Sequence, residues 1–372
     1  METGVLDNAT TSRPGADAVA GATAAGPDAT GSPAAGPDTV GSDASVDPRP
    51  SRANAAEPRL AFLVYLNRSG STFLARLLAE HADVAVSLEA QFDDGLVRAG
   101  GGLRARDEAD LDRLLDHLLA DAKFSAWNVD AERLKARLLD AGLPLTFPKF
   151  LRAALAETFA GDSASVHVYK NGRMLERPAE FRRLFPDAKV VFVLRDPRAV
   201  LASQQRSLDS RTRRPMSSSA VVTARWFRRT MRTLERHVDG GWLYVVRFED
   251  LVADPEQEVG RVLSFLGATP GRRDAETGYA ERIPEAQRHL HQNVGGAARR
   301  ERTESWREEL SPRDVALVES IAGPEMERHG YRSARPRLGL ADRLANGVAR
   351  VGGEIRFALS RARWNLVTRP RL

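Results

Sequence analysis

The sequence predicts an α/β protein whose helices cover both faces of a central parallel sheet, in three α/β/α layers. Short, wholly apolar runs alternate with amphipathic helical patterns over residues 59–331. The strongest apolar runs, residues 60–66 and 189–194, each lead through a short turn into a helical pattern. Such runs are typical of strands buried on both faces, as in parallel sheets covered by helices. Ligands of these sheets bind at the carboxyl ends of the strands, so we expect the functional residues there.

The first strand, residues 60–66, runs into the turn sequence RSGST and then into a helix, which is indicated by apolar residues at helical spacing, Phe73, Leu74, Leu77 and Leu78. The first N–H groups of a helix have no partner within it and lie at the positive end of its dipole. A tight turn before such a helix is therefore an anion site. We expect it to hold a phosphate through five residues, Arg68, Ser69, Gly70, Ser71 and Thr72.

This turn departs from the common nucleotide-binding loop, GxxxxGK[ST]. Ser71 stands in the place of the lysine, and a cation lies instead at Arg68, ahead of the glycine. The lysine normally neutralises the terminal phosphates, so its loss argues against ordinary ATP or GTP hydrolysis. Taken alone, the segment is also compatible with a plain strand-to-helix turn.

A second anion site is indicated later in the chain. The strand at residues 189–194 ends at Arg195, Asp196 and Pro197 start the next helix, and Ser203 lies two turns along it. A guanidinium can donate two hydrogen bonds to the oxygens of one phosphate, and a hydroxyl can donate another. Arg195 and Ser203 are therefore suited to binding a second phosphate. The alternative is that Asp196 merely caps the helix and Arg195 forms a surface ion pair. Further strands are expected at residues 84–86, 166–169 and 243–247.

The two ends of the chain differ from its middle. Residues 1–58 hold eight acidic and three basic residues and almost no large apolar side chains, so we expect a disordered acidic leader rich in Ala, Gly and Pro. Residues 59–334 are predicted to be the catalytic domain and residues 335–372 a basic tail. Cysteine, a secretory signal pattern and an apolar run long enough to span a membrane are all missing from the sequence. We expect a cytoplasmic protein without disulfides or thiolate metal sites.

The tail is expected to form an amphipathic helix. Apolar residues recur every three or four positions, and arginines lie off that face; the apolar series is Leu340, Leu344, Val348, Val351, Ile355 and Leu359. Such a helix can dock on its own domain, on a partner helix or on the acidic leader. It can also give residues 336–372 a peripheral contact with an anionic membrane surface.

Together these segments resemble the sulfotransferases that use 3′-phosphoadenosine 5′-phosphosulfate (PAPS), most closely the carbohydrate and protein-tyrosine branch. In that family a strand–turn–helix like residues 68–72 binds the 5′-phosphosulfate. An arginine that ends a strand and a serine eight residues later, here Arg195 and Ser203, bind the 3′-phosphate. Residues 247–267 resemble the family's strand–helix unit, and Trp306 lies in a likeness of its Arg-x-x-x-Trp stretch. The resemblance implies the P-loop nucleoside triphosphate hydrolase-like sulfotransferase fold, with PAPS as co-substrate and no metal.

The resemblance also assigns the catalytic roles. Glu89 is expected to be the general base that takes the proton of the acceptor, and Lys170, directly after the strand at residues 166–169, to stabilise the transferring sulfonate. His81 is the rival base, since some relatives use histidine. A solvated carboxylate and a solvated strand-capping lysine are the alternatives for the first two.

A basic, glycine-bearing segment, residues 293–306, fits a loop that folds over the 3′-phosphate and the adenine. Its candidates are Arg299, Arg300 and Arg302. The sequence departs from the family at Phe248, where many relatives carry a tyrosine, and at Ser305, where some carry a lysine.

We therefore expect sulfonate transfer to a hydroxyl or amine of a small-molecule, glycan or lipid-linked acceptor. An ATP-dependent small-molecule kinase and a catalytically degenerate scaffold are the alternatives. Nucleic-acid binding is disfavoured, because the net charge of the middle is only about +2 once the acidic leader (−5) and residues 332–372 (ten arginines and two acids, +8) are set apart.

Overall fold

The computed structural model describes most of residues 57–367. The acidic leader lies outside the described residues except for its last two positions. The described residues are 57–89, 105–172, 178–208, 215–217, 219–237, 240–273, 278–279, 281–283 and 301–367.

A five-stranded sheet forms the centre of the fold, and every neighbouring pair of its strands is parallel. The strand order is β2-β3-β1-β4-β5, so the first strand lies in the middle. All five strands lie where the sequence predicts them, within one residue at either end: β1 (Arg59–Tyr65), β2 (Val84–Val86), β3 (Val166–Lys170), β4 (Lys189–Leu194) and β5 (Leu243–Arg247).

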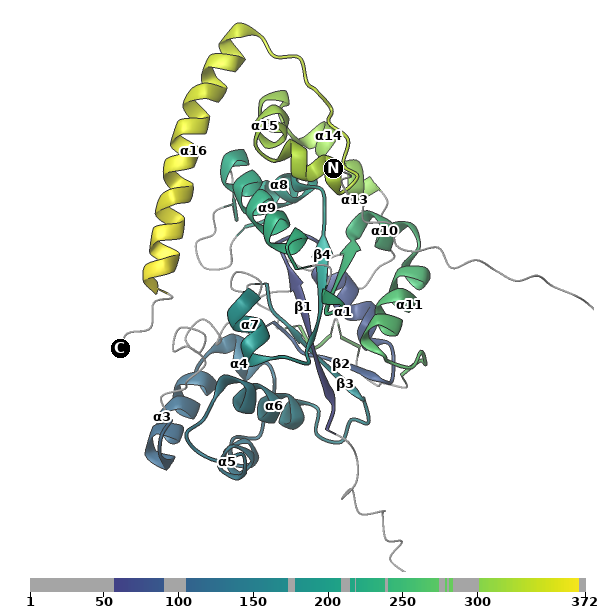
Figure 1. The fold of residues 1–372 in the computed structure, drawn as a ribbon, viewed down its shortest axis with the longest axis vertical. Coiled ribbons are helices and arrows are strands. Elements are labelled where there is room, and N and C mark those ends of the chain that lie inside the picture. Colours follow the sequence, from purple (N-terminus) through teal and green to yellow (C-terminus); the bar gives the residue numbers. More distant parts are fainter. Residues whose placement is uncertain are drawn as a thin grey trace, which may run out of the picture. The chain divides into compact units, whose positions relative to one another are not determined.

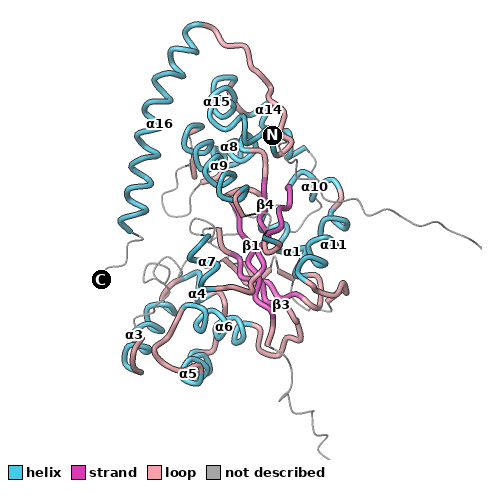
Figure 2. The backbone as a smooth tube through the Cα atoms, in the orientation of Figure 1, coloured by secondary structure: helices cyan, strands magenta, loops and turns pink. Residues whose placement is uncertain are grey.

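Helices cover both faces of the sheet, as predicted (Figures 1 and 2). The crossover from β1 to β2 moves one way along the sheet and the later crossovers move the other way. Because parallel crossovers are right-handed, α1 lies on one face and the helices between β2 and β5 lie on the other. The described helices are α1 (Ser71–Ala79), α3 (Glu108–Leu119), α4 (Ala122–Ser125), α5 (Ala131–Asp140), α6 (Phe147–Thr158), α7 (Pro178–Leu184), α8 (Pro197–Arg206), α9 (Ala220–Glu235), α10 (Phe248–Ala253), α11 (Pro255–Leu266), α13 (Glu301–Glu304), α14 (Trp306–Glu309), α15 (Pro312–Arg328) and α16 (Leu340–Val367).

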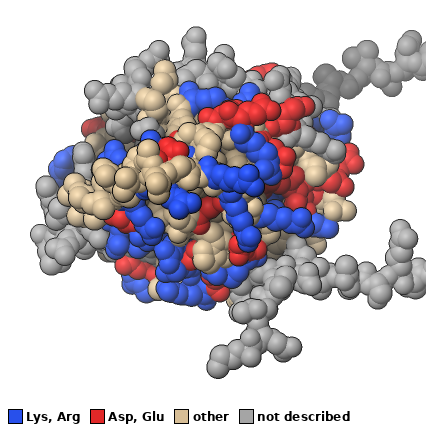
Figure 3. All heavy atoms as spheres, turned by 90° about the horizontal axis from the view of Figure 1, so that it is seen from above, with Lys and Arg blue, Asp and Glu red and all other residues tan. Residues whose placement is uncertain are grey.

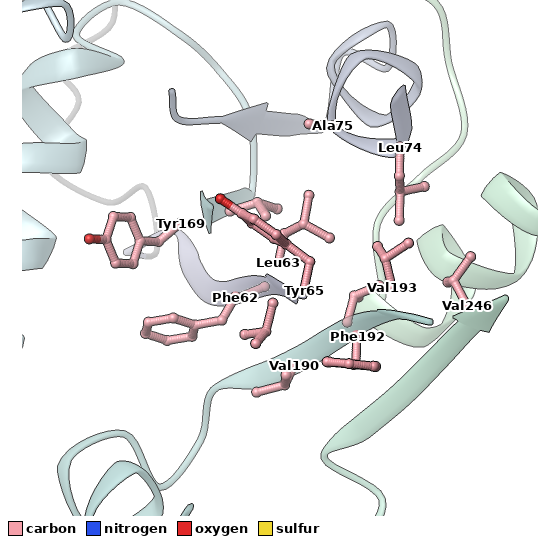
Figure 4. Close-up of a cluster of buried hydrophobic side chains, with 14 of the residues drawn as sticks. Phe62, Leu63, Tyr65, Leu74, Ala75, Tyr169, Val190, Phe192, Val193 and Val246 are labelled. Carbon is pink, nitrogen blue, oxygen red and sulfur yellow. The ribbon is translucent and has the colours of Figure 1, made fainter. Parts of the chain in front are cut away.

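The core lies between the sheet and its helices. Figure 4 shows buried side chains of β1, β3, β4 and β5, such as Phe62 and Val190, together with Leu74 of α1. Three aromatic residues between β2 and β3 are buried in this core: Trp127, Phe147 and Phe150. Burial on both faces explains why β1 and β4 read as unbroken apolar runs.

The carboxyl ends of β1, β3 and β4 meet at one edge of the sheet. Lys170, the last residue of β3, pairs with Leu63 of β1, and Tyr65 of β1 pairs with Val193 of β4. The connections from β1 and β4 leave to opposite sides at this point, which is where open α/β sheets bind ligands. The fold therefore brings the first turn, Lys170 and Arg195 to one place.

The predicted tail helix is α16, and it packs on α9. Gly353 lies against Val221, and Phe357 meets the edge of Trp226 at a centroid distance of 5.4 Å. None of the described helices is long and apolar enough to cross a bilayer.

Candidate active site

The turn between β1 and α1 has the backbone of an anion cradle. Arg68 and Gly70 both have positive φ, 73° and 94°, so the chain reverses within three residues. Ser71 and Thr72 follow in the first helical turn, where N–H groups have no acceptor within the helix. The turn is buried, with Ser69 only 1% exposed.

Gly70 is needed here for two reasons. Its left-handed backbone favours glycine, and a Cβ at this position would lie 2.2 Å from Cδ2 of Phe248. The ring of Phe248 thus lies against the turn, with Cδ2 and Cε2 nearest to Gly70. The guanidinium of Arg195 lies over the same ring, 4.5 Å from its centroid. One aromatic ring therefore joins the two segments that the sequence predicted as separate anion sites.

The second segment supplies what we call the arginine half of the site, formed by Arg68, Arg195, Ser203 and Arg302. Arg195 donates to the backbone carbonyls of Arg68, at 3.0 Å, and Arg302, at 2.7 Å. Arg68 in turn donates through Nε to Oγ of Ser203, at 3.1 Å. The structure therefore brings together the four residues from three distant parts of the chain.

The arginine half is crowded with positive charge. Burial and the neighbouring cations Arg206 and Arg302 lower the pKa of Arg68. Burial, partly offset by Glu249, lowers the pKa of Arg195 to about 10. Two buried polar atoms, Nε of Arg195 and Oγ of Ser69, have no hydrogen-bond partner among the described residues. Buried donors are normally paired, so these two are suited to a bound anion.

The other end of the site, which we call the lysine half, contains Thr72, Lys170, Glu89 and Lys123. Lys170 is buried and donates through Nζ to Oγ1 of Thr72 at 3.0 Å. Its ammonium lies 3.9 Å from the carboxylate of Glu89, which also forms an ion pair with Lys123 at 2.9 Å. Both predicted catalytic residues therefore lie beside the cradle and beside each other.

Electrostatics fix the charge state of this half. Burial opposes ionisation of Glu89, but the charges of Lys170 and Lys123 outweigh it and lower its pKa to about 2. Burial likewise lowers the pKa of Lys170, and Glu89 counteracts that effect. Burial and the charge of Glu89 raise the pKa of Tyr65, whose ring lies 5.3 Å from Nζ of Lys170. Glu89 is therefore a carboxylate at neutral pH and can accept a proton.

The chain is similar to proteins of one known family. A family model described as "Sulfotransferase family" matches residues 61–270, which is more than half of the chain. The chain belongs to the sulfotransferase family. No curated protein sequence matches it.

Solved sulfotransferases are similar to this one at low identity. A sulfotransferase domain from the curacin biosynthetic pathway is 17% identical, with a TM-score of 0.49, covering 74% of this chain and 98% of that one. Sulfotransferase STF9 from Mycobacterium avium is 12% identical, with a TM-score of 0.37 and coverages of 75% and 78%. A retinol dehydratase in complex with androsterone and inactive cofactor PAP is 15% identical, with a TM-score of 0.33 and coverages of 75% and 84%. At these scores the family assignment rests on the matched residues alone.

The rival base of the sulfotransferase, His81, lies elsewhere. It follows α1 and precedes β2, at the amino end of the strands, and its Nδ1 accepts from the backbone N–H of Gly271 at 3.4 Å. The lysine half lies at the opposite, carboxyl ends of β1 and β3. This placement favours Glu89 over His81.

The predicted arginine-rich loop is only partly described. Arg299 and Arg300 lie outside the described residues, whereas Arg302 lies in α13. Arg302 meets Arg195 through its backbone carbonyl, and its side chain adds positive charge near Arg68.

Asp196 does cap α8, as the alternative interpretation held, by accepting from the N–H of Arg198. Its own N–H donates to Glu249, which also accepts from the hydroxyl of Tyr331 at 2.9 Å. Arg195 is nonetheless buried, so it is no surface ion-pair residue. The cap is compatible with the predicted anion site, because the same strand end orients both side chains.

Sequence reasoning missed two residues of this sulfotransferase's site. Tyr65 carries the one hydroxyl in the β1 strand, and that polar group at the carboxyl end was an available signal. Lys123 comes from α4, 34 residues after Glu89, and no pattern in the sequence connects the two. Phe248 was noted only as a departure from the family, whereas it forms the wall between the two anion sites.

Proposed function

We propose that this sulfotransferase moves a sulfonate from PAPS to a hydroxyl or amine of a small-molecule, glycan or lipid-linked acceptor. One observation carries the proposal. The lysine half, with an ionised carboxylate beside a buried lysine, adjoins the turn and the arginine half, where Oγ of Ser69 and Nε of Arg195 have no hydrogen-bond partner among the described residues. A group-transfer site for a doubly phosphorylated donor needs both.

The residues present fit PAPS. The cradle, residues 68–72, would hold the 5′-phosphosulfate, and Arg195 with Ser203 would hold the 3′-phosphate. The unpartnered Nε of Arg195 and Oγ of Ser69 supply hydrogen-bonding capacity, and the cations supply the charge. When bound, PAPS provides a sulfonate attached to a good leaving group, the bisphosphate of adenosine.

The lysine half supplies the remaining chemistry. Glu89 accepts the proton of the acceptor, and Lys170, held by Thr72, places positive charge at the cradle where charge develops on the leaving oxygen. A carboxylate with a pKa of about 2 is a weak base. An acceptor that displaced Lys123, which is partly exposed, from Glu89 would make the carboxylate a stronger base.

The alternative of a small-molecule kinase is less well supported. Ser71 replaces the phosphate-binding lysine of nucleoside triphosphatases, and Arg195 with Ser203 provides for a phosphate that ATP lacks.

The surface charge bears on nucleic-acid binding. Figure 3 shows one face of the molecule, on which basic and acidic side chains are interspersed. That face lacks the continuous basic surface typical of nucleic-acid-binding proteins.

Calorimetry distinguishes these functions. We expect adenosine 3′,5′-bisphosphate to bind at least tenfold more tightly than ADP. Tight binding of ADP without a response to the bisphosphate would instead favour the kinase.

Catalysis is tested by incubating the protein with PAPS labelled in its sulfonate and with cell extracts. Transfer of label that depends on Glu89 supports the proposal and also identifies the acceptor. Bisphosphate binding without transfer to any extract would leave the degenerate scaffold as the better description.

A further inference from the structure

The tail helix α16 has two different faces, and only one of them is used within the domain. On the inner face Gly353 is buried, because a Cβ there would lie 2.4 Å from Cβ of Val221. Phe357 packs on Trp226, and Arg225 forms an ion pair with Glu354. These contacts fix the rotation of the helix about its own axis, so the direction of its other face is determined.

The outer face is apolar and exposed. Its six side chains are 57–79% exposed, and of the described residues only Leu139 and Leu208 are other large hydrophobic residues classed as exposed, at 37% and 39%. At about 100° per residue the six lie within an arc of about 100°, nearly opposite Gly353. We call this set the apolar stripe: Leu340, Leu344, Val348, Val351, Ile355 and Leu359.

The spacing of the apolar stripe favours a flat occupant. Leu340 and Val351 are 11 residues apart, and the seven-residue spacing of a coiled coil occurs only from Leu344 to Val351 and from Val348 to Ile355. An ordinary two-stranded coiled coil sustains that spacing over three or more heptads. A second copy of α16 therefore finds only a short seam on the stripe. The leader, residues 1–58, has almost no large apolar side chains with which to cover it.

The charged residues beside the apolar stripe indicate what lies against it. Arg343, Arg350 and Arg361 border the stripe on one side and Arg356 on the other, and all four are exposed. The two acids of the helix are paired with the domain, Asp342 with Arg313 and Glu354 with Arg225. Arginine side chains extend beside an apolar face to reach phosphates at its margin.

We propose that α16 holds this protein on an anionic lipid surface. The apolar stripe enters the boundary between headgroups and acyl chains, and the flanking arginines bind lipid phosphates. The domain remains outside the bilayer, attached through the inner face of the same helix. This proposal is independent of the reaction proposed above.

Flotation with vesicles tests the proposal on the full chain. We expect at least tenfold more protein to float with phosphatidylcholine vesicles containing phosphatidylglycerol than with phosphatidylcholine alone. The triple variant Leu344→Asn, Val351→Asn, Ile355→Asn is expected to lose at least tenfold of that binding. These side chains are already exposed, so the variant should melt at the temperature of the wild type.

Charge variants provide the matched control. Arg350→Lys with Arg356→Lys keeps the charge and should bind as the wild type does, whereas Arg350→Glu with Arg356→Glu should release the protein. Equal flotation of the wild type and the triple variant would overturn the proposal. A wild-type dimer in solution that the triple variant abolishes, without vesicle binding, would overturn it in favour of a second copy of the chain.

Discussion

The two halves of the site balance their charges differently. In the lysine half, Glu89 lies between two lysines, and opposite charges meet. In the arginine half, buried guanidinium groups lie near one another, and Arg195 donates to backbone carbonyls. The first half has one carboxylate against two lysines, whereas the second has three arginines and no acid among its four members, so an incoming anion stabilises the second half more. We therefore expect the arginine half to govern donor affinity and the lysine half to govern turnover.

Replacing Glu89, the proposed general base, is the strongest test of these two roles. Glu89→Gln keeps the shape of the side chain but cannot accept a proton, so kcat is expected to fall about 10²- to 10⁴-fold. The dissociation constant of adenosine 3′,5′-bisphosphate, measured by calorimetry, should stay within about twofold. His81→Asn is the matched control and should keep near-normal kcat; the reverse outcome would show the assignment of the base to be wrong.

The complementary change acts on the arginine half. Arg195→Ala removes the guanidinium charge and the unpartnered Nε proposed to bind the 3′-phosphate, and a hydrogen bond to a charged group is worth about 1.5–3 kcal/mol. Bisphosphate affinity is expected to fall about 10- to 100-fold. Arg195→Lys keeps the charge but not the planar guanidinium with its several N–H donors, so this variant should recover only part of the lost affinity. Unchanged affinity in both variants would contradict the role given to this half.

A third change tests how the lysines of the lysine half set the pKa of Glu89. Lys123→Ala removes one of the two cations that hold the pKa of Glu89 down to about 2, so that pKa should rise. Loss of activity on acidification then begins at a higher pH. We expect the acidic limb of the pH–kcat profile to move up by about one unit. An acidic limb at the wild-type pH would mean that Lys123 does not act on Glu89 during turnover.

The smallest expected effect concerns His167 and the dependence of the free energy of unfolding on pH, which is separate from the dependence of activity on pH. His167 lies on β3 with Lys170, but burial lowers its pKa to about 4. Because this pKa is lower in the folded than in the unfolded protein, its contribution is full above pH 6.5 and declines as the pH falls toward 4. Between pH 6.5 and 5 the loss is roughly 2 kcal/mol.

His167→Leu should remove that dependence. Its free energy of unfolding, measured in urea, should therefore vary less between these two pH values than that of the wild type. Parallel curves for the two proteins would show that His167 does not contribute.

The sequence located the parts of the site that depend on strand ends. Arg195 and Lys170 could be placed because each follows a continuous apolar run, and the ends of parallel strands share one edge. Lys123 and Phe248 could not be placed, because their roles depend on contacts between side chains distant in the chain. The apolar stripe was visible as a periodicity, but whether it faced inward depended on Gly353 and Phe357 meeting α9.

The contact between Gly70 and Phe248 has a consequence for protein engineering. The floor of the first anion site is continuous in sequence, but its wall comes from a residue 178 positions later. A strand–turn–helix spanning residues 59–79, grafted onto another scaffold, would carry the turn without that wall or the arginine stacked behind it. The proposed donor site is therefore not a portable module, and a chimera that is to retain it must also include β4 with Arg195, β5 and α10.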